Sequence, residues 1–450
     1  MRDDVEVLRA AVRLPTVADR DPTLTDGAPF EALHALLAER FPLLHARLER
    51  VDLGEAAPRA LLWRWPGRAS DRPVVLMAHQ DVVPVTPDDP WTHPAFGADV
   101  VETPDGPAVW GRGTLDDKGQ LVALCAAVER LLADDVVPAQ DVWLSFGADE
   151  EVSGPSAPAA VAELRRRGVE PWFVLDEGGA VAGQAFPGVA APVAVVGATE
   201  KGTTTFSLTV TGRGGHSSTP APKGPTARLA RAIWRLDQRP FPVNVPGPTL
   251  ALLRRLATEL PLPLRALLTG ATRTPPAVLG RALVAAGPET AAMVRTTMVT
   301  TTLSAAPAHN VVAARARAEV NLRIMPGESV ASAIEHVRSA VDDDAVVVDV
   351  VEANEPSPLS PTTEPEAQGA YALLERTIAQ VFPDAVVTPY VMMAGTDSRT
   401  FTAICPRVYR FAPFRMSKEQ RASIHSYDEH VHVGAWLEGV DWYVALLRGL

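Results

Sequence analysis

Three largely apolar segments of the sequence each end in a histidine or in acidic residues, and this pattern limits the fold more than any other feature. The segments are residues 73–78, 143–148 and 172–175. The residues that follow them are His79-Gln80-Asp81, Asp149-Glu150-Glu151 and Asp176-Glu177. Continuous apolar runs of this length are typical of strands buried on both faces of a parallel or mixed sheet. Because functional groups gather at the carboxyl edge of such sheets, the pattern predicts an α/β fold with a site at that edge.

The second of these strand ends carries three adjacent acids, Asp149, Glu150 and Glu151. Like charges held close together repel and raise one another's pKa, and a metal ion would remove that cost. His79 and Asp81 lie two residues apart, so on an extended segment they point the same way, one able to ligate and the other to lie behind it. At the third strand end, Asp176 and Glu177 both remain candidate ligands.

The composition narrows the classes of partner. The chain has 450 residues, which favours two domains, and its net charge of 42 − 54 = −12 argues against nucleic acid or an anionic membrane as the main partner. Its two cysteines cannot form a disulfide framework, which favours a reducing compartment. No secretory signal and no spanning apolar run is visible, so we expect a soluble, cytoplasmic protein.

The residue pattern changes character near residue 199. Residues 203–210 alternate apolar side chains with Thr or Ser, as a half-exposed strand does. A strand, a helix, strands, a helix and a strand follow over 203–351, which predicts a small α+β domain with a one-sided sheet. Residues 240–294, rich in Pro, Leu and Ala, are expected to form short helices. The predicted organisation is a catalytic domain over 1–198 and 356–450, with an inserted domain over 199–355.

A series of short motifs occurs in order between about residues 75 and 432. They are His79-Gln80-Asp81, Gly111–Gly119, Asp149-Glu150-Glu151, Asp176-Glu177-Gly178-Gly179, Gly214–Ser218, Asn321–Gly327, Gly395-Thr396-Asp397 and His425. This series resembles the dinuclear zinc exopeptidase family that includes carboxypeptidase G, aminoacylase and the carboxypeptidase S group. The long 240–300 insert and Trp91-Thr92-His93-Pro94 are most similar to the carboxypeptidase S branch. The resemblance implies a mixed-sheet catalytic domain with an inserted lid or dimerisation domain.

The resemblance also implies a metal site. It places two Zn²⁺ ions, with Co²⁺ or Mn²⁺ as alternatives, bridged by Asp116. His79 and Asp176 would complete one ion, because the family places that ligand at the strand end, and Glu151 and His425 would complete the other. Asp81 would accept the second ring N–H of His79 and fix its tautomer. The Asp116–Asp117 peptide is expected to be cis, as it often is in this family.

The catalytic roles follow from the same resemblance. Glu150 would be the general base, taking a proton from a metal-bound water and passing it to the leaving nitrogen. His216, carried on the small domain, would stabilise the oxyanion, in some family members from a partner subunit. The substrate carboxylate would be held by Asn310, Arg323, Gly395, Thr396 and Arg399, since a guanidinium can grip a carboxylate with two parallel bonds.

The sequence therefore predicts a metal-dependent hydrolase that cleaves an amide next to a free carboxylate in a short peptide or an N-acyl amino acid. Hydrolysis of a non-peptide amide or a carbamoyl compound is one alternative. A non-catalytic member that binds metal or ligand is another, although none of the expected ligands is missing. The expected partner is a small substrate, and a homodimer formed through the small domain is a family expectation.

Overall fold

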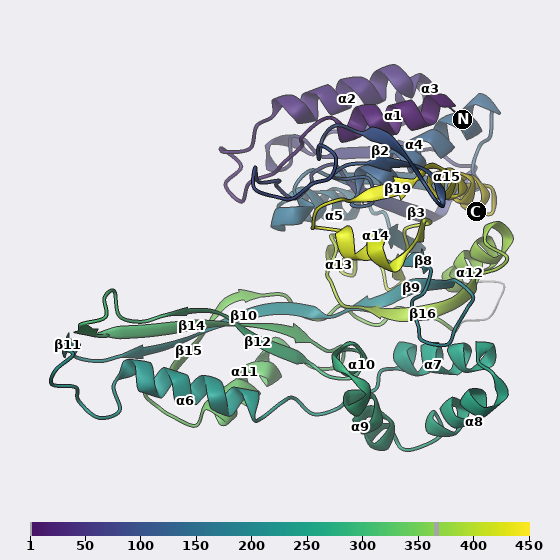
Figure 1. The fold of residues 1–450 in the computed structure, drawn as a ribbon. Coiled ribbons are helices and arrows are strands. Elements are labelled where there is room, and N and C mark those ends of the chain that lie inside the picture. The colour runs from purple at the N-terminus through teal and green to yellow at the C-terminus, as the bar shows by residue number, and fades with distance from the viewer. Residues whose placement is uncertain (1, 364–368) are drawn as a thin grey trace.

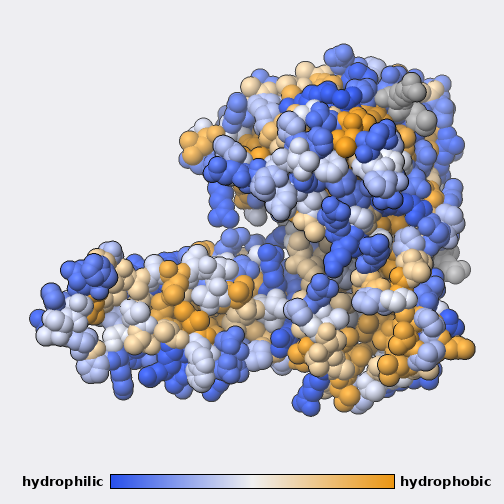
Figure 2. Space-filling model, viewed as in Figure 1, coloured by the Kyte–Doolittle hydropathy of each residue, from blue (hydrophilic) through white to orange (hydrophobic). Residues whose placement is uncertain are grey.

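The computed structural model describes residues 2–363 and 369–450, and two separate sheets organise them (Figure 1). The larger sheet belongs to the catalytic domain. The smaller belongs to an elongated lid that projects to one side. The space-filling view shows the molecule hollowed between these two parts (Figure 2).

The large sheet is mixed, and its strands run in the order β1-β2-β6-β3-β7-β17-β9-β8-β18, with β16 paired to β9. Their bounds are β1 (Glu49–Val51), β2 (Leu61–Trp65), β3 (Ala69–His79), β6 (Gln140–Gly147), β7 (Phe173–Asp176), β8 (Ala180–Ala182), β9 (Val193–Glu200), β16 (Val386–Met392), β17 (Val408–Arg410) and β18 (Arg415–Met416). The three strands predicted from the apolar segments, β3, β6 and β7, are neighbours and parallel. Their carboxyl ends therefore meet at one edge, as the sequence predicted.

Helices cover both faces of the large sheet, so its central strands are buried on both sides. In β3, Val74 and Leu76 pack into the core beneath α4 and α15, whereas Val75 and Met77 pack into the core beneath α5. This alternation explains why the strand has no polar face. The helices of this domain are α1 (Arg2–Val12), α2 (Ala28–Arg40), α3 (Pro42–Arg47), η1 (Gly54–Ala56), α4 (Lys118–Ala133), η2 (Glu150–Val152), α5 (Ser156–Arg166), α12 (Ala370–Val381), α13 (Ser398–Phe401), α14 (Lys418–Ser423) and α15 (Val433–Arg448).

The lid is an antiparallel sheet in the order β12-β14-β10-β15, with two helices on one face. Its elements are β10 (Gly202–Thr211), α6 (Pro225–Asp237), β12 (Thr297–Ser304), β14 (Arg315–Ile324), α11 (Val330–Val341) and β15 (Val347–Ala353). A small ladder of β11 (Gly215–His216) and β13 (Val311–Val312) forms its far tip (Figure 1). The chain passes directly from β9 of the large sheet into β10 of the lid.

The helices between α6 and β12 do not join the lid core. They are α7 (Gly247–Glu259), α8 (Leu262–Ala271), α9 (Pro276–Ala286) and α10 (Pro288–Ala292). Leu252 and Leu256 of α7 share an apolar cluster with Val195 of β9 and Tyr390 of β16. This segment is therefore a layer on the large sheet, although it lies inside the range predicted for the inserted domain.

Several elements were absent from the sequence-based expectation. β8, β9 and β16 were not predicted, nor was the separate sheet of β19 (His430–His432), β5 (Gly106–Trp110) and β4 (Asp99–Thr103). The apolar spacing of residues 30–49 predicts one helix, but the structure divides it between α2 and α3, where Phe41 leaves the helical region before Pro42. The spacing of residues 367–381 predicts a further helix, and the Pro- and Ser-rich residues 352–364 a domain boundary. Of these ranges, Glu364, Ala367 and Gln368 lie outside the described residues, and the helix is described from Ala370. Among the described residues, no helix is long and apolar enough to cross a membrane.

Candidate active site

The carboxyl edge of the large sheet gathers ionisable side chains from five segments of the chain. His79 ends β3, Glu151 lies in η2 directly after β6, and Glu177 follows β7. Asp116 lies in the loop before α4, and His425 follows α14. The last two come from loops far apart in sequence, so the cluster exists only because the fold closes them over the strand ends.

Asp116 lies at the centre of this cluster and faces a histidine with each of its carboxylate oxygens. Its Oδ1 is 2.9 Å from Nε2 of His79, and its Oδ2 is 2.8 Å from Nε2 of His425. Nε2 of His425 also lies 3.2 Å from Oε2 of Glu151. The site therefore has two halves that share one carboxylate.

The two acids at the end of β7 have different neighbours. Oδ2 of Asp176 accepts the backbone N–H of Ser398 at 3.0 Å. Oε1 of Glu177 lies 3.5 Å from Nε2 of His79. Asp176 is the last residue of β7, and consecutive side chains of a strand point to opposite faces, so only one of the two can face His79.

Asp81 lies beside His79 and also bonds to the turn after β6. Nδ1 of His79 is 3.4 Å from Oδ1 of Asp81 and 3.0 Å from its backbone carbonyl. The Asp81 carboxylate also accepts the backbone N–H groups of Glu150 and Glu151, at 3.1 and 3.0 Å. Asp81 thus fixes the end of β3 to the turn that carries the two glutamates.

The loop that carries Asp116 is held by a buried ion pair that the sequence analysis missed. Arg112 Nη1 donates to Oε2 of Glu429 at 2.6 Å, and both side chains are buried. Oε1 of Glu429 accepts the backbone N–H groups of Gly113, Leu115 and Asp116, at 3.0, 2.8 and 3.2 Å. The Asp116–Asp117 peptide is cis, as expected. Glu429 is a single acid directly before His430 in a mixed segment, so no sequence pattern identifies it.

The pKa values of the clustered side chains are shifted by burial and by their neighbours. Burial and the charge of Asp116 raise the pKa of Glu177 to about 8, and burial raises the pKa of Glu150 well above its usual range. Hydrogen bonds to Asp116 and Glu151 raise the pKa of His425 to about 10. Burial opposes charging of Asp116, yet its hydrogen bonds to His425 and His79 hold its pKa below the usual range. Acids that are buried together in this way are stabilised by a nearby positive charge.

The donor atoms fit divalent metal ions. Two sets of ligand atoms lie within 4.8 Å of one another: His79, Asp116 and Glu151, and His79, Asp117 and Glu177. Oε1 of Glu151 and Oδ1 of Asp117 are buried and have no hydrogen-bond partner among the described residues. Imidazole nitrogens with carboxylate oxygens are ligands that Zn²⁺ and similar ions accept. The side chain of His425 is 54% exposed, so the cluster opens to solvent on that side.

A second group of side chains lies where β9 passes into the lid. Oε1 of Glu200 accepts the backbone N–H of Thr396 at 3.1 Å, its hydroxyl at 2.7 Å and Nε of Arg410 at 2.7 Å. Arg399 Nε donates to the carbonyl of Thr396 at 2.9 Å. A Cβ on Gly395 would lie 1.7 Å from Nη2 of Arg399, so any other residue there would displace that guanidinium. The predicted Gly395–Thr396–Arg399 segment is therefore one rigid unit, anchored by Glu200.

Arg323 lies near this unit. It is on β14, and its Nη1 donates to the hydroxyl of Thr203 at 2.8 Å. Burial, together with the nearby charge of Arg399, lowers the pKa of Arg323. Glu319 pairs with Arg317 and Glu328 accepts from Thr296, whereas the nearby charge of Glu352 partly offsets the lowered pKa of Arg323. Arg323 and Arg399 thus place two cations near each other.

The lid tip carries the two remaining predicted residues, and both are exposed. His216 is on β11, and Ser217 donates its backbone N–H to the carbonyl of Asn310 at 3.2 Å. Nδ1 of His216 accepts the backbone N–H of Ser218 at 3.2 Å, so in the neutral ring Nε2 carries the proton. The tip lies at the end of the lid away from the catalytic domain, so one chain does not bring His216 or Asn310 to the cluster (Figure 1).

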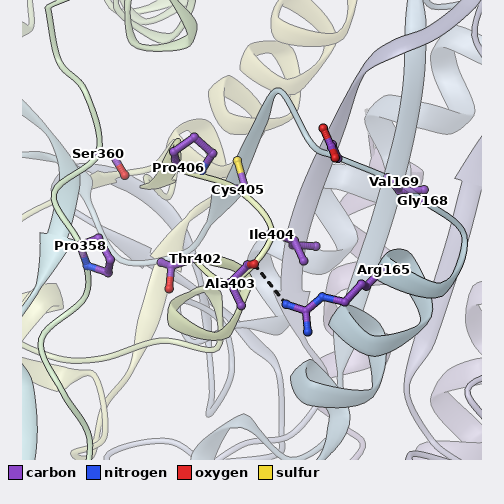
Figure 3. Close-up of a pocket in the computed structure, with 11 residues that line it drawn as sticks. Arg165, Gly168, Val169, Pro358, Ser360, Thr402, Ala403, Ile404, Cys405 and Pro406 are labelled. Atoms are coloured by element: carbon purple, nitrogen blue, oxygen red, sulfur yellow. Dashed lines mark hydrogen bonds between the residues drawn. The ribbon is translucent and has the colours of Figure 1, made fainter.

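A hollow of about 500 Å³ lies elsewhere on the catalytic domain, between α5 and the loop after α13 (Figure 3). Its lining includes Cys405, whose thiol donates to the carbonyl of Pro171 at 3.2 Å. Burial raises the pKa of that thiol to about 11, so it is not a nucleophile at neutral pH. Arg165 closes one side by donating to the carbonyl of Ala403 at 3.2 Å. None of the predicted site residues lines this hollow.

Comparison with known proteins agrees with the motifs. The model of peptidase family M20/M25/M40 matches residues 75–449. A Dictyostelium discoideum protein named "Probable carboxypeptidase S-like 2" is 34% identical over 428 residues, which are 93% of this chain and 79% of that protein. The human protein named N-fatty-acyl-amino acid synthase/hydrolase PM20D1 is 36% identical over 379 residues, which are 84% of this chain and 74% of that protein.

The fold agrees as well. The crystal structure of an M20 family metallo-carboxypeptidase from Sulfolobus solfataricus matches with a TM-score of 0.72 at 15% identity, covering 100% of this chain and 99% of that chain. At this identity the match concerns the fold alone. The family model and the sequence relatives carry the assignment: the chain belongs to peptidase family M20/M25/M40 and is an enzyme of this metallopeptidase and amidohydrolase family.

Proposed function

We propose that the protein hydrolyses an amide bond next to a free carboxylate, in an N-acyl amino acid or a short peptide. The observation that carries this proposal is the position of Asp116, whose two oxygens face His79 and His425 within 3 Å. A shared carboxylate flanked by further acids is the donor arrangement that two divalent ions require.

The proposed ligands are His79 and Glu177 for one ion, Glu151 and His425 for the other, and Asp116 between them. Glu177 replaces Asp176 from the sequence-based scheme, because its carboxylate is the one that faces His79. Two such ions, Zn²⁺ or alternatively Co²⁺ or Mn²⁺, would polarise the scissile carbonyl and lower the pKa of the attacking water.

The chain's own groups would handle the protons and the substrate. Glu150 accepts a proton from the attacking water and passes it to the leaving nitrogen, and its raised pKa makes its carboxylate a stronger proton acceptor. Arg323 and Arg399, with the backbone of Gly395 and Thr396, hold the substrate carboxylate. Glu200 keeps that unit in place through Thr396.

The lid residues complete the site from a second subunit. His216 and Asn310 lie at a tip remote from the cluster of their own chain (Figure 1). In a homodimer formed through the lids, the tip of one chain reaches the cluster of the other, where the Nε2–H of His216 stabilises the oxyanion. The lid therefore contributes to catalysis in its partner.

The acyl group is proposed to be apolar. The human relative is named for N-fatty-acyl amino acids, and α7 to α10 add an apolar layer beside β16, whose end leads to Gly395. An assay with paired N-acyl amino acids of short and long chain, dipeptides and N-carbamoyl amino acids, with Zn²⁺, Co²⁺ or Mn²⁺ supplied, tests this. Turnover restricted to N-carbamoyl compounds would favour the alternative reaction. Metal binding without turnover of any substrate would contradict the proposal.

A further inference from the structure

Helix α8 has no buried residue, although its sequence is almost entirely apolar. Leu262, Leu264 and Leu267 are 78%, 47% and 70% exposed, and Val278 of the next helix is 53% exposed. Figure 2 shows hydrophobic residues gathered over this part of the surface, where Figure 1 places α7 and α8. A contiguous apolar surface of this kind needs a covering partner.

The same stretch is cationic within an acidic protein. Residues 260–288 contain Arg265, Arg273 and Arg281 and no Asp or Glu, so their charge is 3 − 0 = +3, against −12 for the whole chain. Arg265 donates to the backbone carbonyls of Leu260 and Thr258, and no ion pair involves Arg273 or Arg281 among the described residues. The surface formed by α8 and α9 therefore combines exposed leucines with arginines that make no ion pair among the described residues, although Glu259 and Glu289 flank the stretch.

From these features we propose that the surface of α8 and α9 docks on an anionic lipid surface. Helices with an apolar side and flanking arginines lie in the plane of a bilayer interface, with leucines at the acyl boundary and cations at the headgroups. The net charge of −12, which argued against a membrane partner, conceals this local excess of positive charge.

A second copy of the chain fits this surface less well. In a two-fold symmetric dimer the same patch meets itself, so Arg273 and Arg281 would face their own copies without an acid inside the patch. The surface also lies at the other end of the molecule from the lid tip (Figure 1). Docking of α8 and α9 therefore leaves the lid free, and it goes beyond the hydrolytic function proposed above.

The test is co-sedimentation of the purified protein with vesicles of equal parts phosphatidylcholine and phosphatidylserine, and with vesicles of phosphatidylcholine alone. We expect binding to the anionic vesicles only, and weaker binding at high salt because salt screens the attraction. Leu262→Gln with Leu267→Gln should weaken binding about tenfold or more, since two exposed leucines lose their apolar contact. Arg273→Glu with Arg281→Glu should weaken it roughly thirtyfold.

Matched variants elsewhere on the surface provide the controls. Leu24 is 70% exposed, and Leu24→Gln should leave vesicle binding unchanged. The pair Arg231→Glu and Arg376→Glu makes the same charge change at exposed positions outside the patch. Unchanged thermal unfolding midpoints exclude misfolding. Three results would overturn the proposal: no sedimentation with anionic vesicles, equal sedimentation with phosphatidylcholine alone, or a Leu262→Gln, Leu267→Gln variant that loses a dimer instead of vesicle binding. None of these readouts depends on catalysis.

Discussion

The two halves of the proposed site differ in how the chain holds them. In the catalytic domain, Asp116 and His79 are buried and are fixed by partners such as Glu429 and Asp81, which themselves bond to backbone N–H groups. At the lid tip, His216 is exposed on a ladder with two residues in each strand, and its ring bonds to Ser218. In the proposed function, a single chain would therefore supply the metal-binding half, whereas the oxyanion-binding half would need a rearrangement or a second subunit.

The largest expected effect lies in the catalytic half. Glu150→Gln keeps the size of the side chain but removes its ability to accept a proton, so kcat should fall about 10³-fold or more. Metal content, measured by elemental analysis after dialysis, should stay at the wild-type level. Glu170→Gln, at an exposed acid of the same domain, is the matched control. Substantial residual turnover in Glu150→Gln would refute the role of this residue.

The second-largest expected effect concerns His216 on the lid. His216→Ala should lower kcat about 100-fold because the oxyanion loses a hydrogen-bond donor, with metal affinity unchanged. His309→Ala, at another exposed lid histidine, should have no effect.

Mixing two inactive variants then separates the two ways of completing the site. If the lid acts in its partner, co-refolded His216→Ala and Glu150→Gln chains should recover about a quarter of the wild-type activity, since half of the dimers carry one intact site. Recovery of none would show that each lid closes over its own chain.

A smaller effect distinguishes the two neighbouring acids after β7. Glu177→Gln should lower the affinity for one metal ion about 100-fold, whereas Asp176→Asn should lower it about tenfold, through the lost bond to Ser398. Calorimetric titration of the metal-free protein measures both affinities. A larger loss of metal affinity in Asp176→Asn than in Glu177→Gln would instead support Asp176, the ligand predicted from the sequence.

The smallest effect is a dependence of metal binding on pH. When no metal is bound, the fold raises the pKa of His425 to about 10. Protonation of this imidazole therefore stabilises the folded state, and the effect is complete at pH values below the usual pKa of histidine. That stabilisation is lost as the pH rises through about 10, and protons compete with metal below it. Metal affinity should therefore increase between about pH 6 and about pH 8, with proton release on binding. An affinity that does not change over this range would contradict the proposed ligation by His425.

The sequence alone indicated the fold class, the parallel strands β3, β6 and β7, and the family. These followed because continuous apolar runs with polar ends are a local property, and because the motifs occur in a fixed order. The motifs also pick out His79 and Asp116, whose side chains lie 2.9 Å apart in the structure.

Only the tertiary structure decided the choices that depend on direction in space. Asp176 and Glu177 are chemically similar neighbours, and which of them faces His79 depends on the pleat of β7. Glu429 and Glu200 lie far along the chain from the loops that they hold, so no local pattern identifies them. The exposure of α8 is also a tertiary property, because an apolar helix with no buried side chain has the same sequence signal as a core helix. Composition and periodicity determine what a segment forms, and packing determines what it faces.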